Sequence, residues 1–303
     1  MKIIHNNELY ELLSISGGKY EVNSIEDAYT FCKKIAKYHY ENFPVGSIFI
    51  PKKLRNYVYS IYSFARIADD IADEIKKNNF NKIKALDQLL DLVNDFTIIN
   101  SGKGNPIILA IQDTIKKKNI PISTLERLIT AFKMDSEFKQ PQNFQELLNY
   151  CDYSANPIGE IVLRLFDEWS DENKLYSDKI CSALQLINFW QDLSIDLKNS
   201  RVYIPNEFLK KYQISISNRT LIGKEKNLIL CLNELFILTE QLIWEGSQLL
   251  TNIRNFRLKQ EIRLTINAAM VVLRKSKKLN IRLLEVRPKL NKFDYIKVVF
   301  SNK

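Results

Sequence analysis

Glycine and proline, which most often interrupt helices, are scarce in this sequence: 303 residues contain only eight of each. Few turn formers between long segments with helical hydrophobic periodicity predict an all-α protein. No linker, repeat or low-complexity tract divides the chain, so we expect one domain over residues 24–303. Residues 1–23, which contain Gly17 and Gly18, are expected to be a poorly organised N-terminal segment.

Cysteine is also sparse, and no Cys-x-x-Cys pair occurs among the four cysteines. Widely separated cysteines are typical of reduced, mostly buried thiols in a cytoplasmic protein. The first residues contain no apolar signal core, and no run of about 18 uncharged apolar residues exists, so we predict no transmembrane helix. We therefore expect a cytoplasmic protein.

The net charge of +9 favours an anionic partner such as nucleic acid, an anionic membrane surface or a phosphorylated ligand. The basic residues are scattered, however, and no helix-turn-helix, zinc-finger or RNA-binding signature is present. We therefore predict no nucleic-acid partner.

Four carboxylates occupy six positions of an apolar stretch, Arg-Ile-Ala-Asp-Asp-Ile-Ala-Asp-Glu at residues 66–74. Asp69 and Asp73 are four residues apart, so a helix places them on one face, with Tyr62 and Arg66 on the same stripe. Like charges at this spacing destabilise a helix, and a divalent cation shared with substrate phosphates would offset that cost. The alternative is a solvated acidic face.

A second stretch, residues 185–196, repeats the pattern with Asp192 and Asp196 four residues apart. Asn188 lies one turn before this pair, and Gln185 lies a further turn back. A polar stripe on an apolar helix must face water or another polar group, because an unpaired buried polar group is costly. We predict that the two stripes face each other across a cavity and clamp a metal-bound diphosphate.

Two further stretches contain candidate residues with competing interpretations. His39 precedes a Pro-Gly loop and is either a ligand-facing group or a histidine partly buried at a helix end. Tyr150 and Tyr153, three apart, would present hydroxyls to one side. Lys198 and Arg201 follow the second stripe, where they would meet a diphosphate or interact with the helix dipole.

Hydrophobic periodicity and helix-breaking residues predict the helix boundaries. Pro157 and Gly159 indicate a kink or break, either beside a ligand or at a plain helix junction. The expected helices cover about 24–40, 51–77, 80–98, 106–117, 122–138, 175–197, 223–253, 257–276 and 292–301.

On these residues, the chain from about 25 to 300 resembles the squalene/phytoene synthase family. The resemblance depends on both Asp-x-x-x-Asp motifs, their flanking residues and the sequence Asn-Ser-Arg-Val-Tyr-Ile-Pro at 199–205. Residues 39–51, 64–74, 154–160 and 188–205 are most similar to the hydroxysqualene synthase branch of bacterial hopanoid pathways.

The resemblance implies an isoprenoid-synthase-type helical bundle around a central cavity, so that residues 24–303 would form the catalytic domain. It implies Mg²⁺, with Mn²⁺ as a substitute, held by Asp69, Asp73, Asn188, Asp192 and Asp196. The substrate-binding candidates are His39, Tyr62, Arg66, Gln185, Asn188, Gln191, Lys198, Arg201 and Asn156. Arg287 is the candidate for a C-terminal arginine that some relatives use.

Two departures favour one branch of the family. Condensing members usually carry Arg where this chain has Gln191, and Val-Ala-Gly where it has Ser154, Ala155 and Asn156. These changes favour conversion of presqualene diphosphate and water to hydroxysqualene, without NADPH, over head-to-head condensation of two prenyl diphosphates. Tyr150, Tyr153, Asn156 and Gln191 would hold the captured water. A helical lipid-binding protein is the non-enzymatic alternative, and a long-chain substrate is compatible with peripheral membrane association.

Overall fold

The structure is a computed structural model that describes residues 9, 11–38, 50–74, 79–291, 294 and 298. Helices account for nearly all of the regular structure in these residues, apart from one short β-hairpin, so the all-α prediction is confirmed. Contacts between Cα atoms divide the chain into two units. Unit 1 contains residues 1–137 and 161–167, and unit 2 contains residues 138–160 and 168–303. The prediction of one catalytic domain over 24–303 remains a prediction.

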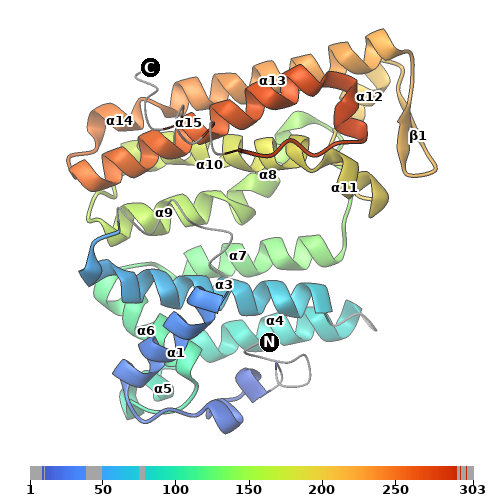
Figure 1. The fold of residues 1–303 in the computed structure, drawn as a ribbon. Helices are drawn as coiled ribbons and strands as arrows, with labels where there is room; N and C mark the ends of the chain where they lie inside the picture. The colour runs from blue at the N-terminus through green and yellow to red at the C-terminus, as the bar shows by residue number, and fades with distance from the viewer. Residues whose placement is uncertain are drawn as a thin grey trace. The chain divides into compact units, whose positions relative to one another are not determined.

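Unit 1 is organised around the helix that carries the first carboxylate motif (Figure 1). Its buried face consists of apolar side chains at helical spacing, including Phe64, Ile67 and Ile71. This face packs against the neighbouring helices of the unit, which satisfies the hydrophobic pattern of the sequence. The helices are α1 (Ile25–Tyr38), α3 (Arg55–Glu74), α4 (Asn79–Asn94), α5 (Thr97–Ser101), α6 (Pro106–Lys118) and α7 (Ile122–Ser136).

The described part of the N-terminal segment is folded, unlike the poorly organised segment that we predicted. It forms two short 3₁₀ helices, η2 (Glu11–Leu13) and η3 (Gly18–Tyr20), and Leu12 is 1% exposed. The side chain of buried Asn105 donates to the Leu12 and Ser14 carbonyls at 2.7 and 3.1 Å while it caps α6. The sequence offered no local sign of this bond, because 91 to 93 residues separate the partners.

Unit 2 contains three long helices that run side by side, α10 (Asp171–Gln191), α13 (Glu225–Gly246) and α15 (Phe256–Leu279) (Figure 1). Trp190 of α10 is fully buried, and its Nε1 donates to the Thr239 hydroxyl at 2.9 Å. The remaining elements are α8 (Phe144–Ser154), α11 (Leu193–Lys198), α12 (Asn206–Lys211), β1 (Ser215–Ser217), β2 (Thr220–Ile222), α14 (Leu249–Asn252) and η6 (Asn280–Leu284).

The predicted break near Pro157 and Gly159 is confirmed. Helix α8 ends at Ser154, and α9 (Asn156–Leu165) begins after Ala155. Gly159 approaches α10 so closely that an added Cβ would lie 2.3 Å from the Ser177 hydroxyl oxygen. Close helix packing therefore accounts for the glycine.

Other boundaries differ from the sequence prediction at specific points. The antiparallel hairpin β1–β2 was not predicted, and the helix expected over 223–253 ends at Gly246. The four cysteines are free, as predicted, and burial raises the pKa of Cys32 to about 12.

Gly246 provides a test of how tightly α10 and α13 pack. A Cβ at this position would lie 2.7 Å from Ile180 and 2.9 Å from the Tyr176 carbonyl oxygen. Because a backbone atom must move, we expect Gly246→Ala to destabilise the fold by about 1–3 kcal/mol. Urea unfolding measures this change, with Gln241→Ala, exposed on the same helix, as the control. Equal stability of both variants would contradict the tight contact.

The segment Glu225–Asn252 is long and apolar enough to cross a membrane, with a mean hydropathy of 1.2. Core helices often meet the same criterion, and α13 packs against α10 and α15. Length and composition therefore do not make it a membrane span, and the predicted cytoplasmic location remains a prediction.

Candidate functional site

The first carboxylate motif lies on one uninterrupted helix, α3, as predicted. Tyr62, Arg66 and Asp69 are half-buried, and Asp73 is exposed. The intervening Ile67, Ala68, Ile71 and Ala72 are buried. The polar stripe therefore lies beside a buried face of the helix and does not belong to a fully solvated acidic helix.

Arg66 pairs with two neighbouring carboxylates on α3. One guanidinium nitrogen donates to Asp69 at 3.1 Å, and another pairs with Asp70. Its Nε is buried and makes no hydrogen bond to the described residues. Among the described residues, this Nε donor therefore has no acceptor.

The Asp69 carboxyl group has a higher pKa than an ordinary aspartate. Burial, followed by the nearby Asp73 carboxylate, raises its pKa from 3.8 to about 6, although Arg66 opposes the shift. Asp135 on α7 acts in the same direction. Sequence reasoning missed Asp135, because nothing near it in the chain indicates that α7 packs against α3. Negative charge is crowded at this end of α3, where a cation would be stabilised.

The second motif lies at a junction and not within one continuous helix. Helix α10 ends at Gln191, Asp192 occupies the junction, and α11 begins at Leu193. The helical hydrogen bonds nevertheless continue, from Asp192 N to Asn188 O at 2.8 Å and from Asp196 N to Asp192 O at 2.9 Å. The predicted four-residue spacing therefore still places these residues on one side.

The C-terminal segment supplies a cation to the second motif. The guanidinium of Arg287 makes a two-pronged ion pair with Asp192, with one N–O distance of 3.2 Å. Gln191 donates to the Pro288 carbonyl at 2.7 Å. Sequence reasoning named Arg287 as a candidate but gave it no position. Gln191 stands where condensing relatives usually carry arginine. It therefore lies beside Pro288, the residue that follows Arg287.

Asp196 resembles Asp69 in its electrostatics. Burial and then Asp192 raise its pKa from 3.8 to about 6, while Arg201 and Arg287 lower it. Arg201 therefore lies close to the motif, as predicted, and its backbone N–H donates to the Asp196 carbonyl at 2.8 Å. Lys198 is exposed, and no hydrogen bond or ion pair between described residues links it to the motif.

The predicted water-holding residues on α8 and α9 have different environments. Tyr150 packs against Phe189 and Tyr203, whose rings stack with centroids 3.7 Å apart. Tyr153 is 37% exposed. Asn156 is buried, donates to Asp152 at 2.6 Å and accepts from Ser182 at 3.0 Å. Its amide thus joins α8, α9 and α10, and its proposed contact with water remains a prediction.

Three further predicted site residues, His39, Asn188 and Gln185, have separate outcomes. His39 lies outside the described residues. Asn188 is exposed and Gln185 is half-buried, which fits the predicted polar stripe.

The first motif belongs to unit 1 and the second to unit 2, so the prediction that they face each other is untested. Within the described residues, no three His, Cys, Asp or Glu side chains converge to form a ready-made metal cluster.

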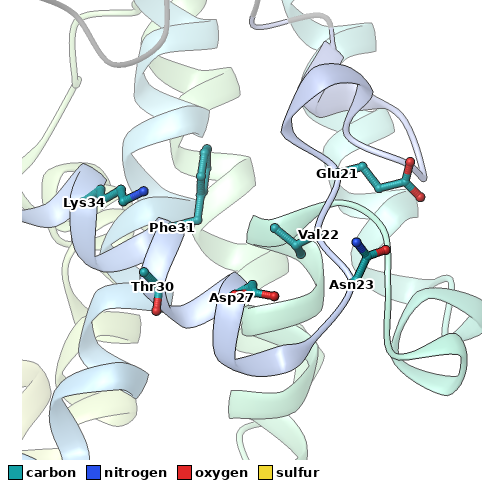
Figure 2. A pocket seen from close by; sticks show the side chains of 7 residues that line it. All are labelled: Glu21, Val22, Asn23, Asp27, Thr30, Phe31 and Lys34. Carbon is teal, nitrogen blue, oxygen red and sulfur yellow. The ribbon is translucent and has the colours of Figure 1, made fainter.

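A surface hollow of about 280 Å³ lies in unit 1, before and along α1 (Figure 2). None of its lining residues is a predicted site residue, and its side chains come from the approach to α1 and from α1 itself. We assign it no part in the reaction. It is lined by Glu21, Val22, Asn23, Asp27, Thr30, Phe31 and Lys34.

Comparisons with known proteins show one family in sequence and in structure. The family model described as squalene/phytoene synthase matches residues 36–294. A hydroxysqualene synthase of Sinorhizobium fredii is 31% identical over 77% of this chain and 78% of that protein. A hydroxysqualene synthase of Rhodopseudomonas palustris is 30% identical over 73% of this chain and 74% of that protein. The crystal structure described as squalene synthase HpnC from Alicyclobacillus acidocaldarius superposes with a TM-score of 0.77 and 28% identity, covering 85% and 95% of the two chains.

Proposed function

This chain belongs to the squalene/phytoene synthase family, and we propose that it converts presqualene diphosphate and water to hydroxysqualene and diphosphate. The family makes it an enzyme that processes a prenyl diphosphate. The observation that carries the proposal is the pair of Asp-x-x-x-Asp motifs, each with a desolvated carboxylate beside a second carboxylate.

The donor set fits Mg²⁺. This ion prefers oxygen ligands and is usually held by one or two carboxylates together with substrate phosphates, not by an all-protein cage. Each motif offers two carboxylates, and Asn188 adds an amide oxygen. Asp69, Asp73, Asn188, Asp192 and Asp196 would hold the metal, which supplies charge neutralisation of the diphosphate leaving group when bound.

Three arginines lie beside the carboxylate motifs, Arg66 at the first and Arg201 and Arg287 at the second. Arg66 has a buried Nε without a partner in the described chain, and the guanidinium of Arg287 is two-fifths exposed beside Asp192. Charge-assisted hydrogen bonds to phosphate are short and strong, and arginine can make two at once. Arg66, Arg287 and Arg201 would therefore stabilise the charge that develops as the C–O bond breaks and diphosphate takes the electron pair.

The second motif and its neighbours support the hydroxysqualene branch over the condensing one. Gln191 brings an uncharged amide to a position where condensing relatives usually carry a guanidinium, and it is anchored to Pro288. The carbocation left by diphosphate departure would rearrange against apolar side chains. A water held by one of four candidates would then form the new C–O bond, and its proton would pass to the released diphosphate; the candidates are Tyr150, Tyr153, Asn156 and Gln191. No oxidation or reduction is needed, so we propose no NADPH.

Head-to-head condensation of two prenyl diphosphates is the second candidate. The family includes squalene and phytoene synthases, and the similar crystal structure bears the name squalene synthase. The two reactions share the diphosphate clamp and differ in whether a second prenyl diphosphate or water captures the cation. Family membership disfavours the earlier alternative of a lipid-binding protein without activity.

A product assay separates these candidates. Purified protein and Mg²⁺ are incubated separately with presqualene diphosphate and farnesyl diphosphate, without nicotinamide cofactor, and the lipids are identified by mass spectrometry. We expect hydroxysqualene from presqualene diphosphate, unchanged farnesyl diphosphate, and no product after chelation of the metal. Presqualene diphosphate or a hydrocarbon formed from farnesyl diphosphate would move the protein to the condensing branch. No turnover of either substrate would restore the lipid-binding alternative.

The raised pKa values predict how pH acts on the protein. Between about pH 4 and 6 the folded state keeps protons on Asp69 and Asp196 that the unfolded chain releases, so the metal-free protein becomes less stable as pH rises. Because metal ligands must be deprotonated, stabilisation by Mg²⁺ should grow over the same interval and level off above about pH 6.

Thermal unfolding with and without Mg²⁺ measures both trends. The double variant Asp69→Asn/Asp196→Asn is the control and should lose most of the pH dependence in this interval. The prediction would be contradicted if Mg²⁺ stabilised the protein equally at every pH from about 4 to 7.

A further inference from the structure

Helix α13 is apolar on two opposite faces. One face, which includes Leu232, Leu235 and Phe236, is buried in unit 2. On the other side, Leu230, Ile237 and Trp244 are 43%, 60% and 69% exposed. These three residues are seven apart, so they form one line along the helix, which we call the α13 stripe.

Lysines neutralise glutamates that flank the α13 stripe. Single exposed apolar residues are common, but a continuous line with a large tryptophan is typical of an interaction surface. Three glutamates of α13 flank the stripe from Leu230 to Trp244, and each is paired with a lysine from a neighbouring element. The pairs are Glu234 with Lys211 at 2.7 Å, Glu240 with Lys277, and Glu245 with Lys179.

A second exposed group lies at the same end of unit 2 as Trp244. Helix α14 joins the end of α13 to the start of α15 (Figure 1). There Phe256 is 71% exposed and lies between exposed Arg254 and Arg257, a group that we call the α15 corner. The Glu168 carboxylate accepts from the backbone N–H of Arg254 at 3.1 Å, which fixes this turn.

We propose that the α13 stripe and the α15 corner dock onto the surface of a lipid bilayer that contains anionic headgroups. Tryptophan is favoured at membrane interfaces because its ring is apolar and its N–H is polar. A helix that lies in the interface buries apolar side chains while flanking arginines attract anionic lipid. The net charge of +9 favours the same partner.

Charge favours a bilayer over a second copy of the chain as the occupant. A two-fold dimer through this surface would place the same patch against itself. Arg254 and Arg257 would then add like charge to both sides of the contact, as would exposed Lys226 at the other end of the α13 stripe. Anionic lipid complements these cations. The proposal depends only on the surface of unit 2 and not on the reaction proposed above.

Vesicle sedimentation with the full chain tests the proposal. We expect the protein to sediment with vesicles of mixed phosphatidylcholine and phosphatidylglycerol, less so with phosphatidylcholine alone, and less at high salt. Ile237→Ser/Trp244→Ser should weaken the partition coefficient by roughly tenfold or more, because two large apolar side chains no longer enter the interface. Phe96→Ser, a similarly exposed aromatic in unit 1, is the matched control and should bind as the wild type does.

The cationic part of the surface is tested separately. Arg254→Gln/Arg257→Gln should weaken binding to the mixed vesicles by roughly thirtyfold, since two cations no longer attract the anionic headgroups. Lys103→Gln/Lys116→Gln, which removes two exposed charges from unit 1, should bind as the wild type does. Circular dichroism checks that every variant is folded.

Three results would overturn the proposal. The first is a wild-type protein that does not bind the mixed vesicles, and the second is equal binding by the stripe variant and its Phe96→Ser control. The third is a wild-type dimer, seen by light scattering, that Ile237→Ser/Trp244→Ser converts to a monomer without any effect on vesicles. That last result would assign the surface to a second copy of the chain.

Discussion

Asp69→Asn is expected to lower turnover by about 10³-fold or more while leaving the protein at least as stable as the wild type. The amide keeps the size of the side chain but removes the negative charge that the clamp needs. It also relieves repulsion with Asp73, which lies one turn away on α3. Arg66 keeps its pairing with Asp70, so the helix retains an ion pair at this position.

Steady-state turnover and thermal unfolding of the same preparation measure both effects. The matched control is Asp91→Asn, which removes an exposed carboxylate from α4. This control should retain activity. Near-normal turnover in Asp69→Asn would contradict a role for this carboxylate in the reaction. A variant less stable than the wild type would contradict the predicted relief of repulsion.

Arg287→Gln is expected to lower turnover by about 10²-fold, because the variant lacks the guanidinium beside Asp192 that would stabilise the leaving diphosphate. Lysine should rescue only part of the loss, since its single point charge cannot form the two-pronged contact. Stability should change by less than about 1 kcal/mol, as is usual for partly exposed ion pairs.

Turnover and affinity for inorganic diphosphate separate a binding role from a structural one. A residue that only holds the C-terminal segment would leave diphosphate affinity unchanged in the Arg287→Lys variant. Arg282→Gln removes an exposed arginine from η6 and is the control, with activity expected near that of the wild type. Equal turnover in the two glutamine variants would show that Arg287 takes no part in the reaction.

The Gly246→Ala variant tests a different property from these two substitutions. Its effect arises from the packing of α10 against α13 and should appear in stability before it appears in activity. The two classes of variant therefore separate loss of chemistry from loss of fold.

Local features of the sequence were sufficient to predict several of the long helices and both motifs. Helical periodicity and helix-breaking residues identified α1, α3, α6 and α7 closely, because these signals act over one or two turns. The spacing of Asp69 and Asp73 likewise defined one face of α3. The spacing of Asp192 and Asp196 also defined one side of the second motif, since the backbone hydrogen bonds continue through the junction at Asp192.

Contacts between distant parts of the chain could not be predicted in this way. Arg287 and Asp192 are 95 residues apart, and the Asn105 side chain holds a segment more than 90 residues earlier. Asp135 became a neighbour of Asp69 only through helix packing. The pKa values of about 6 also depend on burial, which periodicity indicates for a face but does not measure for one carboxyl group.

The sequence by itself therefore determined the all-α class, the two carboxylate motifs and the family, because each depends on residues close together in the chain. Tertiary structure alone decided which cation pairs with Asp192, how strongly Asp69 is desolvated, and that α13 has a second apolar face exposed. The physical reason is that periodicity describes one helix at a time. Charge pairing and burial depend on which other helices pack against it.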